Sequence, residues 1–192
     1  MGFMPNRFTI IPTGVTIPRM CATRRENAVL FVGRLIPVKG ITYLIQAMKN
    51  VQAKLWVVGD GPQKAEAETL ARKEGVAATF FGYRADVDTF LRRAKVFVLP
   101  SLSEGLPLSL LEAYAHQIPC VVTDIGLPAR HLSDALVVPQ GNIEALASAI
   151  RKLLKNPALR RRLSRNAYQK AKTFRWSKTA RRYEEVAKTC AE

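Results

Sequence analysis

Cysteine is scarce in this chain. Its 192 residues include only three, Cys21, Cys120 and Cys190. They are odd in number and far apart, so they form neither a disulfide framework nor the short spacing of a metal site. Such usage is typical of a protein that folds in a reducing cytosol. Cys120 lies in an apolar run, and we interpret it as a small core side chain.

Long apolar runs are also missing. No stretch approaches the roughly 18 apolar residues that a membrane-spanning helix requires. Residues 1–7 have no apolar core of the kind found in secretory signal peptides. Hydrophobic residues still make up 48% of the chain, which is enough to bury a core at this length. We therefore expect a folded, cytoplasmic protein.

Acidic residues are outnumbered by basic ones. There are 15 Asp and Glu against 30 Lys and Arg, which gives a net charge of +15. Residues 151–182 contain thirteen Lys or Arg and no Asp or Glu. This asymmetry fits a solvated helical face, an anionic membrane surface or nucleic acid. Nucleic acid is the least favoured, because the stretch has few interleaved aromatic residues and no nucleic-acid-binding motif.

Short apolar runs, β-branched or aromatic in character, alternate with segments that have apolar residues at helical spacing. Such runs are typical of parallel strands covered on both faces. The expected strands are residues 8–11, 29–32, 55–58, 79–81, 96–99, 120–123 and 135–138. The expected helices are residues 41–48, 62–74, 86–94, 108–116, 142–154, 157–174 and 177–191. Asp86, Asn142 and Ser177 are suited to N-cap three of these helices.

This alternation predicts an α/β fold, a doubly wound parallel sheet of Rossmann-like type with right-handed crossovers. We expect one domain over residues 1–192, with a helical C-terminal tail over about residues 156–192. Ligands of such sheets bind beyond the carboxyl ends of the strands. The residues suited to chemistry should therefore lie in the loops that follow the strands.

Residues 33–40 (GRLIPVKG) join an expected strand to an expected helix. Arg34 offers a planar fork for phosphate, and Lys39 offers a compact positive charge. Gly33 and Gly40 allow the backbone to approach a ligand closely. An ordinary surface loop could have the same composition, so this segment alone leaves both interpretations open.

Residues 103–113 (SEGLPLSLLEA) place two carboxylates around a turn. The turn exposes backbone N–H groups at a helix start, where the helix dipole favours a pyrophosphate. Glu104 precedes the helix, and Glu112 inside it can accept hydrogen bonds from both hydroxyls of a ribose. A capping carboxylate and a solvent-facing Glu would look similar. A nucleotide sugar, with phosphates and sugar hydroxyls, would use both halves.

Taken in order, short segments of this chain resemble the C-terminal, donor-binding domain of a retaining GT-B glycosyltransferase of the group-one type (glycosyltransferase family four). The segments are residues 11–15 (IPTGV), 31–35 (FVGRL) with 39–40 (KG), 58–62 (VGDGP), 81–83 (FGY), 100–105 (PSLSEG), 112–113 (EA) and 123–126 (TDIG). The resemblance covers roughly residues 8–155. It implies a hexosyltransferase whose substrate is a nucleoside-diphosphate sugar and which uses no cofactor.

The resemblance also implies roles for single residues. Arg34, Lys39 and Glu104 would be catalytic: the two cations stabilise the leaving diphosphate, and Glu104 lies near the transferred sugar. Glu112 would hold the ribose. The other donor-binding residues it implies are Gly33, Gly105, Leu106, Leu108 and Ser109 around the diphosphate, with Tyr83 and Arg84 beside the base.

The chemistry that we expect of this site requires no Mg²⁺ or Mn²⁺. Fixed cations and helix N–H groups can stabilise a departing diphosphate without a metal. We therefore expect metal-independent chemistry and no metal site. His116 and His131 are interpreted as a helix-end and a loop residue, not as catalytic bases. Residues 126–129 (GLPA) depart from the family pattern, because Ala129 replaces an acid.

The resemblance begins at the connection between the two domains of such enzymes. We therefore expect an N-terminal acceptor-binding domain or subunit as partner. Without that partner this domain should be inactive alone, or nearly so. It should bind nucleotide but transfer sugar poorly, because transfer requires the acceptor to be held beside the donor. Residues 151–182 would favour a position at the inner face of a membrane. A non-catalytic nucleotide-binding or partner subunit is the alternative, and a nucleotide-sugar epimerase of the same fold is less favoured.

Overall fold

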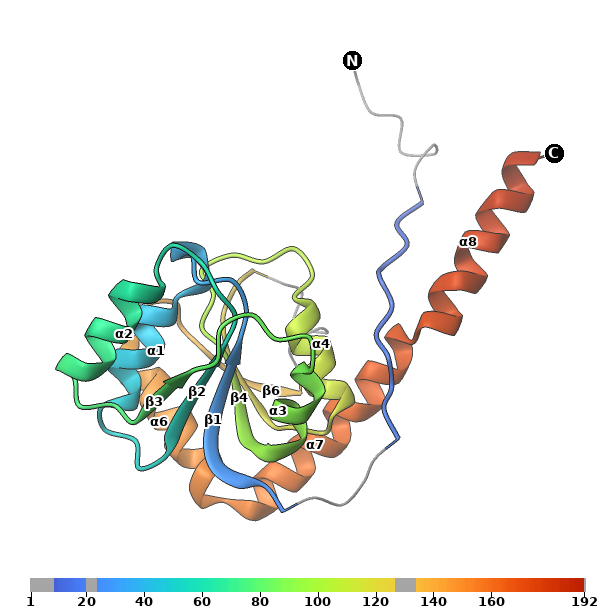
Figure 1. Ribbon diagram of the computed structural model, residues 1–192. Helices are drawn as coiled ribbons and strands as arrows, with labels where there is room; N and C mark the ends of the chain where they lie inside the picture. Colours follow the sequence, from blue (N-terminus) through green and yellow to red (C-terminus); the bar gives the residue numbers. More distant parts are fainter. Residues whose placement is uncertain (1–8, 20–23, 127–133, 192) are drawn as a thin grey trace.

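The computed structural model describes residues 9–19, 24–126 and 134–191. Its centre is a six-stranded parallel sheet with the strand order β3-β2-β1-β4-β5-β6 (Figure 1). The strands are β1 (Glu26–Val32), β2 (Lys54–Val58), β3 (Ala78–Phe80), β4 (Ala94–Leu99), β5 (Cys120–Thr123) and β6 (Ala135–Val138). This order confirms the predicted doubly wound, Rossmann-like sheet.

Helices cover both faces of the sheet (Figure 1). One layer contains α1 (Ile41–Met48), α2 (Lys64–Lys73) and α6 (Ile143–Lys155), and the other contains α3 (Val87–Arg93) and α4 (Leu108–Ala115). Helix α7 (Pro157–Ala171) runs from the first layer to the second, because Leu163 packs in one core cluster and Ala167 and Ala171 in the other. Helix α8 (Trp176–Ala191) extends away from the body. Two short 3-10 turns, η2 (Pro37–Lys39) and η3 (Lys172–Phe174), complete the elements.

The sheet is buried on both sides, which explains the unbroken apolar runs of its strands. In β1 the residues from Ala28 to Phe31 are all fully buried. Leu30 faces the layer of α3 and α4, and Phe31 faces the layer of α1, α2 and α6. Alternate side chains of one strand therefore contribute to two separate halves of the core.

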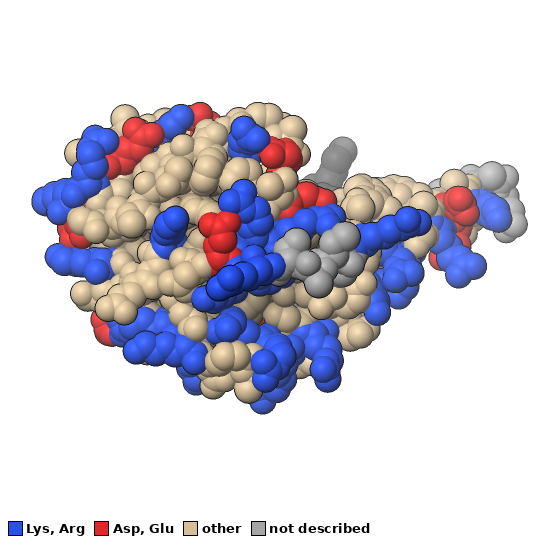
Figure 2. Space-filling view, turned by 60° about the horizontal axis from the view of Figure 1, so that its bottom comes forward, with Lys and Arg blue, Asp and Glu red and all other residues tan. Residues whose placement is uncertain are grey.

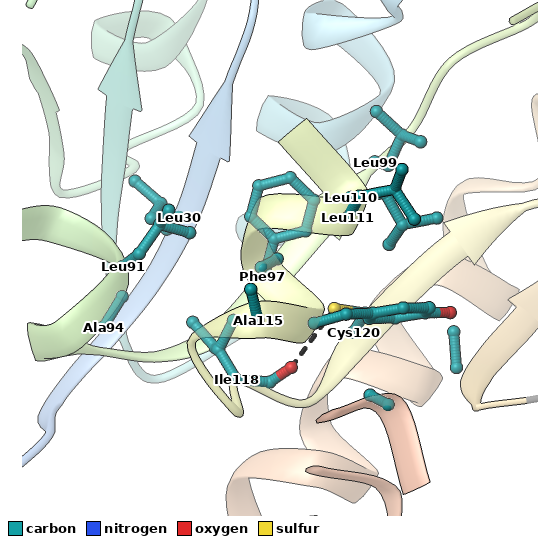
Figure 3. Packing of buried hydrophobic residues seen from close by; sticks show 14 of the residues in the cluster. Leu30, Leu91, Ala94, Phe97, Leu99, Leu110, Leu111, Ala115, Ile118 and Cys120 are labelled. Atoms are coloured by element: carbon teal, nitrogen blue, oxygen red, sulfur yellow. Dashed lines mark hydrogen bonds between the residues drawn. The ribbon is translucent and has the colours of Figure 1, made fainter. Parts of the chain in front are cut away.

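Cys120 belongs to the core half on the α3 and α4 side, where it packs near Phe97 and Ile118 (Figure 3). Its Sγ donates a hydrogen bond to the Ile118 carbonyl at 3.2 Å. Complete burial raises the pKa of the Cys120 thiol, which keeps it protonated and unreactive. The prediction of a small core side chain is confirmed.

The first expected strand is wrong over its described part. Residues 9–11 form no strand, and Ile10 is exposed; Phe8 lies outside the described residues. The segment instead follows the junction between η3 and α8. Val15 forms an isolated parallel bridge with Arg175, and its N–H donates to the Phe174 carbonyl at 2.7 Å. The backbone contact with the C-terminal part of the chain is therefore made by Val15, beyond the expected strand.

The predicted helix caps have mixed outcomes. Asn142 caps α6 as expected, because its side chain accepts a hydrogen bond from the Ala145 N–H at 2.9 Å. Asp86 stands at the N-cap position of α3, but its carboxylate binds Arg84 instead of a helix N–H. Ser177 lies inside α8, which begins one residue earlier at Trp176, so the predicted cap there is wrong.

Candidate functional site

Loops that follow β1, β2 and β4 meet at the carboxyl edge of the sheet, and glycines permit the close contact. Gly40 has a φ of 68°, and a Cβ there would lie 2.1 Å from the Pro100 carbonyl oxygen. Gly59 has a φ of 134°, and its Cβ would lie 1.9 Å from the Gly33 carbonyl oxygen. Both distances exclude a side chain, so these positions require glycine. The basic segment 33–40 is thereby held against both neighbouring loops.

Lys39 and Glu104 are brought into direct contact at this edge. Lys39 Nζ lies 2.7 Å from Glu104 Oε1 and 2.8 Å from Oε2. The Glu104 side chain is only 9% exposed and that of Lys39 22%, so the pair is largely shielded from water. Ser101 Oγ donates a further hydrogen bond to Glu104 Oε1 at 2.7 Å. Two of the three residues expected to be catalytic therefore form one charged cluster.

Arg34 lies in the same loop but outside this cluster. The Leu35 N–H donates to the Asp60 carbonyl at 2.8 Å, which fixes the loop beside Arg34. The Arg34 residue itself is exposed, and its guanidinium has no hydrogen-bond partner within the ranges that the structure describes. A side chain in this state is available to an anionic ligand.

The N-terminus of α4 is open to a ligand. Pro107 occupies the N-cap position, and no side chain from the described part of the chain caps the helix there. Leu108 and Ser109 are the first two helical residues, whose N–H groups have no acceptor inside a helix. Gly105 has open space where a Cβ would stand, and Leu108 is 48% exposed. Leu106 is partly buried against the core. This geometry suits an anion.

Glu112 lies on α4, one turn further along the helix. Partial burial, and secondarily the charge of Asp88 on α3, raises the pKa of Glu112. Asp88 Oδ1 also lies 2.9 Å from His116 Nε2. His116 is buried at the end of α4, with Nδ1 2.8 Å from the Glu112 carbonyl oxygen, which confirms its expected place as a helix-end residue. Glu112 is thus flanked by a second carboxylate that the sequence did not indicate.

Tyr83 and Arg84 lie in the loop between β3 and α3. The Gly82 carbonyl accepts a hydrogen bond from the Gly59 N–H at 2.8 Å, which ties this loop to the carboxyl edge. Tyr83 is 82% exposed. Arg84 is bound by both Asp86 oxygens at 2.7 and 2.9 Å, so contact with a ligand would require it to leave that carboxylate.

Ser101 and Thr123 are the polar residues near the site to which the sequence gave no role. Both are buried, and Thr123 Oγ1 donates to the Ser101 carbonyl. A hydroxyl residue directly after a strand, three positions before an acid, is the pattern that could have indicated Ser101. Thr123 offered no such pattern, because it reaches Ser101 only through the sheet.

Residues 9–19, 24–126 and 134–191 contain no group of three or more His, Cys, Asp or Glu placed to hold a metal ion. Over the same residues, no helix combines the length and apolar character that crossing a membrane requires. His131 and most of the segment 126–129 lie outside the described residues.

The chain belongs to the family of group 1 glycosyl transferases, whose sequence model matches residues 22–170. The lipopolysaccharide core biosynthesis glycosyltransferase LpsD of Rhizobium meliloti is 35% identical to it over 151 residues, which are 76% of this chain and 44% of that protein. The uncharacterized glycosyltransferase MJ1178 of Methanocaldococcus jannaschii is 29% identical over 91% of this chain and 52% of that protein. The chain thus spans about half the length of these curated relatives.

Solved structures agree with this assignment. Sucrose-phosphate synthase from Thermosynechococcus elongatus has 28% identity and a TM-score of 0.82, over 94% of this chain and 52% of that one. TarM of S. aureus, crystallised with UDP among its ligands, has a TM-score of 0.84 at 21% identity, over 94% of this chain and 40% of that one. The second likeness concerns the fold alone. The Rossmann-like architecture is therefore that of GT-B glycosyltransferases.

Proposed function

We propose that this chain is the donor-binding part of a retaining glycosyltransferase of family four, which transfers a hexose from a nucleoside-diphosphate sugar without a metal. The observation that carries the proposal is the Lys39–Glu104 cluster beside the uncapped start of α4. One anion-binding element and one hydroxyl-binding carboxylate stand together at the edge where sheets of this topology bind ligands.

The departing diphosphate is stabilised by fixed positive charge. Breaking the bond between the sugar and the diphosphate leaves negative charge on the phosphate oxygens. Arg34 and Lys39 supply cations, and the N–H groups of Leu108 and Ser109 supply oriented dipoles. The segment that carries Lys39 is held before a ligand binds, because the loops after β1, β2 and β4 contact one another closely at Gly40 and Gly59.

The two carboxylates take different hydroxyls. Glu104 accepts hydrogen bonds from the transferred sugar, while Glu112 accepts them from the ribose, as an ionised carboxylate can do with a diol. Tyr83 and Arg84 border the base, and Gly33 and Gly105 leave room for the diphosphate. No cofactor enters this scheme.

An N-terminal domain or subunit supplies the acceptor in this proposal. Support comes from the relatives, which are about twice as long as the part that this chain matches. Alone, this part should bind nucleotide sugar but transfer poorly or not at all, because transfer requires an acceptor held beside the donor. The protein acts in the cytoplasm.

A basic surface gives the second part of the proposal. Figure 2 shows Lys and Arg spread, with few acidic residues between them, over the side that lies below in Figure 1. On α7, Arg161, Arg162 and Arg165 are exposed and form no ion pair with described residues. We propose that this side lies against anionic headgroups at the inner face of a membrane.

Loops at the amino ends of the strands extend the same surface. Three hollows in the described part of the chain share Asn27, and two of them are lined by cations from distant parts of the sequence. One, of about 500 Å³, is lined by Arg24, Lys54 and Lys95 among others, and its neighbour of about 330 Å³ by Arg151 and Lys155. Cations of residues 151–182 therefore lie near Arg24, Lys54 and Lys95, which are far from them in the sequence.

Binding of nucleotides to the isolated chain tests the proposal. Isothermal titration with UDP, GDP, ADP and their glucose conjugates should show at least one micromolar to millimolar ligand, and Glu112→Ala should weaken it. No binding by any of them would contradict the proposal. Sugar transfer after an N-terminal domain of a relative is joined to the chain would support the enzyme, and nucleotide binding without transfer would support the alternative of a non-catalytic subunit.

A further inference from the structure

The two oxygens of the Glu104 carboxylate accept different numbers of hydrogen bonds. Oε1 accepts hydrogen bonds from both Lys39 Nζ and Ser101 Oγ, each at 2.7 Å, while among the described residues Oε2 accepts only from Lys39, at 2.8 Å. A carboxylate has about four acceptor sites. Three are occupied, and the remaining one, on Oε2, is available to a sugar hydroxyl.

Ser101 is itself fixed by Thr123, which stands at the end of the neighbouring strand β5. Ser101 is fully buried, and Thr123 is 3% exposed. Thr123 Oγ1 lies within hydrogen-bond distance of two carbonyls on the β4 segment, those of Leu99, at 3.3 Å, and Ser101. The Thr123 hydroxyl therefore joins β5 to the turn that presents the Ser101 side chain.

Further contacts fasten this turn up to residue 102. The Leu102 N–H donates to the Val38 carbonyl at 2.8 Å, next to Lys39, and the Leu102 carbonyl accepts from Gln140 Nε2 at 2.7 Å. After Glu104 the chain is open at Gly105, which is exposed and has nothing within 4 Å of its Cβ position, before Leu106 and Pro107 pack against the body again. Glu104 thus stands at the boundary between a fixed turn and an open one, and its direction depends on Ser101 and Lys39.

We propose that Ser101 and Thr123 are positioning residues that set the direction of the Glu104 carboxylate toward the donor sugar. The proposal rests on the proposed function. In that function Lys39 also serves the diphosphate, so its bonds to Glu104 weaken once the ligand is bound. Ser101 is then the donor that keeps Oε1 in place and leaves Oε2 to the sugar. Loss of either hydroxyl should therefore affect the sugar more than the nucleoside diphosphate.

Four variants separate this role from a structural one. Ser101→Ala and Thr123→Val remove the hydroxyls, and Thr123→Ser restores one at the same position. Thr179→Val is the matched control, because Thr179 is also buried (5% exposed) and donates to the Pro12 carbonyl at 3.1 Å, far from Glu104 in the fold. Thermal unfolding of all four reports the structural cost of a lost buried hydroxyl.

Titration calorimetry measures the ratio of the affinities for UDP-glucose and UDP, which decides between the two roles. If the parent chain binds another nucleoside diphosphate and its glucose conjugate better, that pair is used instead. Ser101→Ala and Thr123→Val should weaken the conjugate by about tenfold, as expected for a weakened hydrogen bond to a charged group, and the diphosphate by less than about twofold. Thr123→Ser and Thr179→Val should bind both ligands like the parent.

Equal weakening of both ligands, or no weakening, would overturn the positioning role. So would a Thr123→Ser variant that behaves like Thr123→Val. If Ser101→Ala does not fold, the two Thr123 variants decide by the same criterion. A parent chain that binds none of the nucleotides would overturn the proposed function itself, which is a separate outcome from an unchanged ratio.

Discussion

Lys39 Nζ contacts both carboxylate oxygens of Glu104, although the two residues are 65 positions apart in the sequence. One follows β1 and the other follows β4, and these strands are neighbours in the sheet. In the function that we propose, the cation that binds the diphosphate and the carboxylate that binds the sugar therefore contact each other before a ligand is bound.

Removing the two partners singly should have different effects. Lys39→Met should lower the affinity for the nucleoside diphosphate by about tenfold or more, because a charge-assisted bond to phosphate is lost. Glu104→Gln should leave that affinity unchanged or higher, since Lys39 is released, but should weaken the sugar conjugate. Calorimetry measures both. Lys49→Met is the control, because Lys49 pairs with Glu74 at 2.9 Å outside the site. Equal effects of the two site variants would contradict separate roles.

Arg34→Ala should lower the affinity for the nucleoside diphosphate without lowering the stability of the fold. The Arg34 guanidinium has no partner among the described residues, so its loss leaves no buried group unpaired. We expect an unchanged midpoint of urea unfolding and a diphosphate affinity lower by about tenfold. Arg162→Ala, an exposed cation on α7, should change neither quantity. An Arg34 variant that is destabilised, or that binds like the parent, would show that Arg34 does not meet the ligand.

Glu112→Gln should weaken nucleotide binding and raise the free energy of unfolding, by an amount that increases with pH. The folded state raises the pKa of Glu112 through burial and then through Asp88. The ionised form is therefore disfavoured on folding, and the parent loses stability as the pH rises from the ordinary carboxyl pKa through the raised one. Below that window the charge contributes nothing to the difference between folded and unfolded chains.

Urea unfolding at pH 4 and pH 7 measures this effect. The Gln variant, compared with the parent, should gain more stability at pH 7 than at pH 4, while it loses affinity for the nucleoside diphosphate. Glu144→Gln serves as control, because Glu144 is exposed on α6. A stability difference that does not vary with pH would mean that Glu112 is not desolvated.

Arg25 should contribute strongly to the free energy of unfolding and should not take part in ligand binding. Nη1 donates to the carbonyls of Leu91 and Ala94 at 2.8 and 2.7 Å, and Nη2 to those of His116 and Gln117 at 2.7 and 3.2 Å. These carbonyls end α3 and α4, where helices leave acceptors unsatisfied. Arg25→Met should lower the free energy of unfolding by about 2–4 kcal/mol. A loss below about 0.5 kcal/mol would show that water replaces the guanidinium.

Charge reversal on α7 tests the membrane surface. Arg161→Glu with Arg162→Glu should weaken binding to phosphatidylglycerol vesicles by tenfold or more, because each cation near an anionic surface contributes about 1 kcal/mol. Arg72→Glu with Lys73→Glu, on α2, makes the same change in net charge elsewhere. Co-sedimentation at low and high salt measures both. Equal weakening by the two variants would mean that net charge alone, and not this side of the protein, attracts the vesicles.

Much of the fold could be predicted because the strands β1, β2, β4 and β5 are covered on both faces and therefore appear as unbroken apolar runs. The helix 41–48 agrees with α1 in both bounds. The failures have physical causes. The run 8–11 is as apolar as a strand, but the backbone contacts of this part of the chain are made further on, by Val15 with Phe174 and Arg175, which lie far along the sequence.

The charged residues of the candidate site could be predicted from the sequence, but the hydroxyl residues that contact them from neighbouring strands were not predicted. Arg34, Lys39 and Glu104 could be singled out because they follow strands of a parallel sheet. Ser101 had only its place three positions before Glu104 to indicate it, and Thr123 had no such signal, because it meets Ser101 only through the register of β4 beside β5. Asp88 was missed for the same reason, since only the packing of α3 beside α4 brings it near Glu112.

The most direct test of the central claim is a titration of the isotope-labelled chain with UDP, GDP and ADP, followed through the backbone amide signals. The account predicts that one of these nucleotides shifts the amides of Leu108 and Ser109 and of residues 33–40, at the carboxyl edge of the sheet. Shifts confined to the basic hollows around Asn27, or no shifts with any of the three, would contradict it.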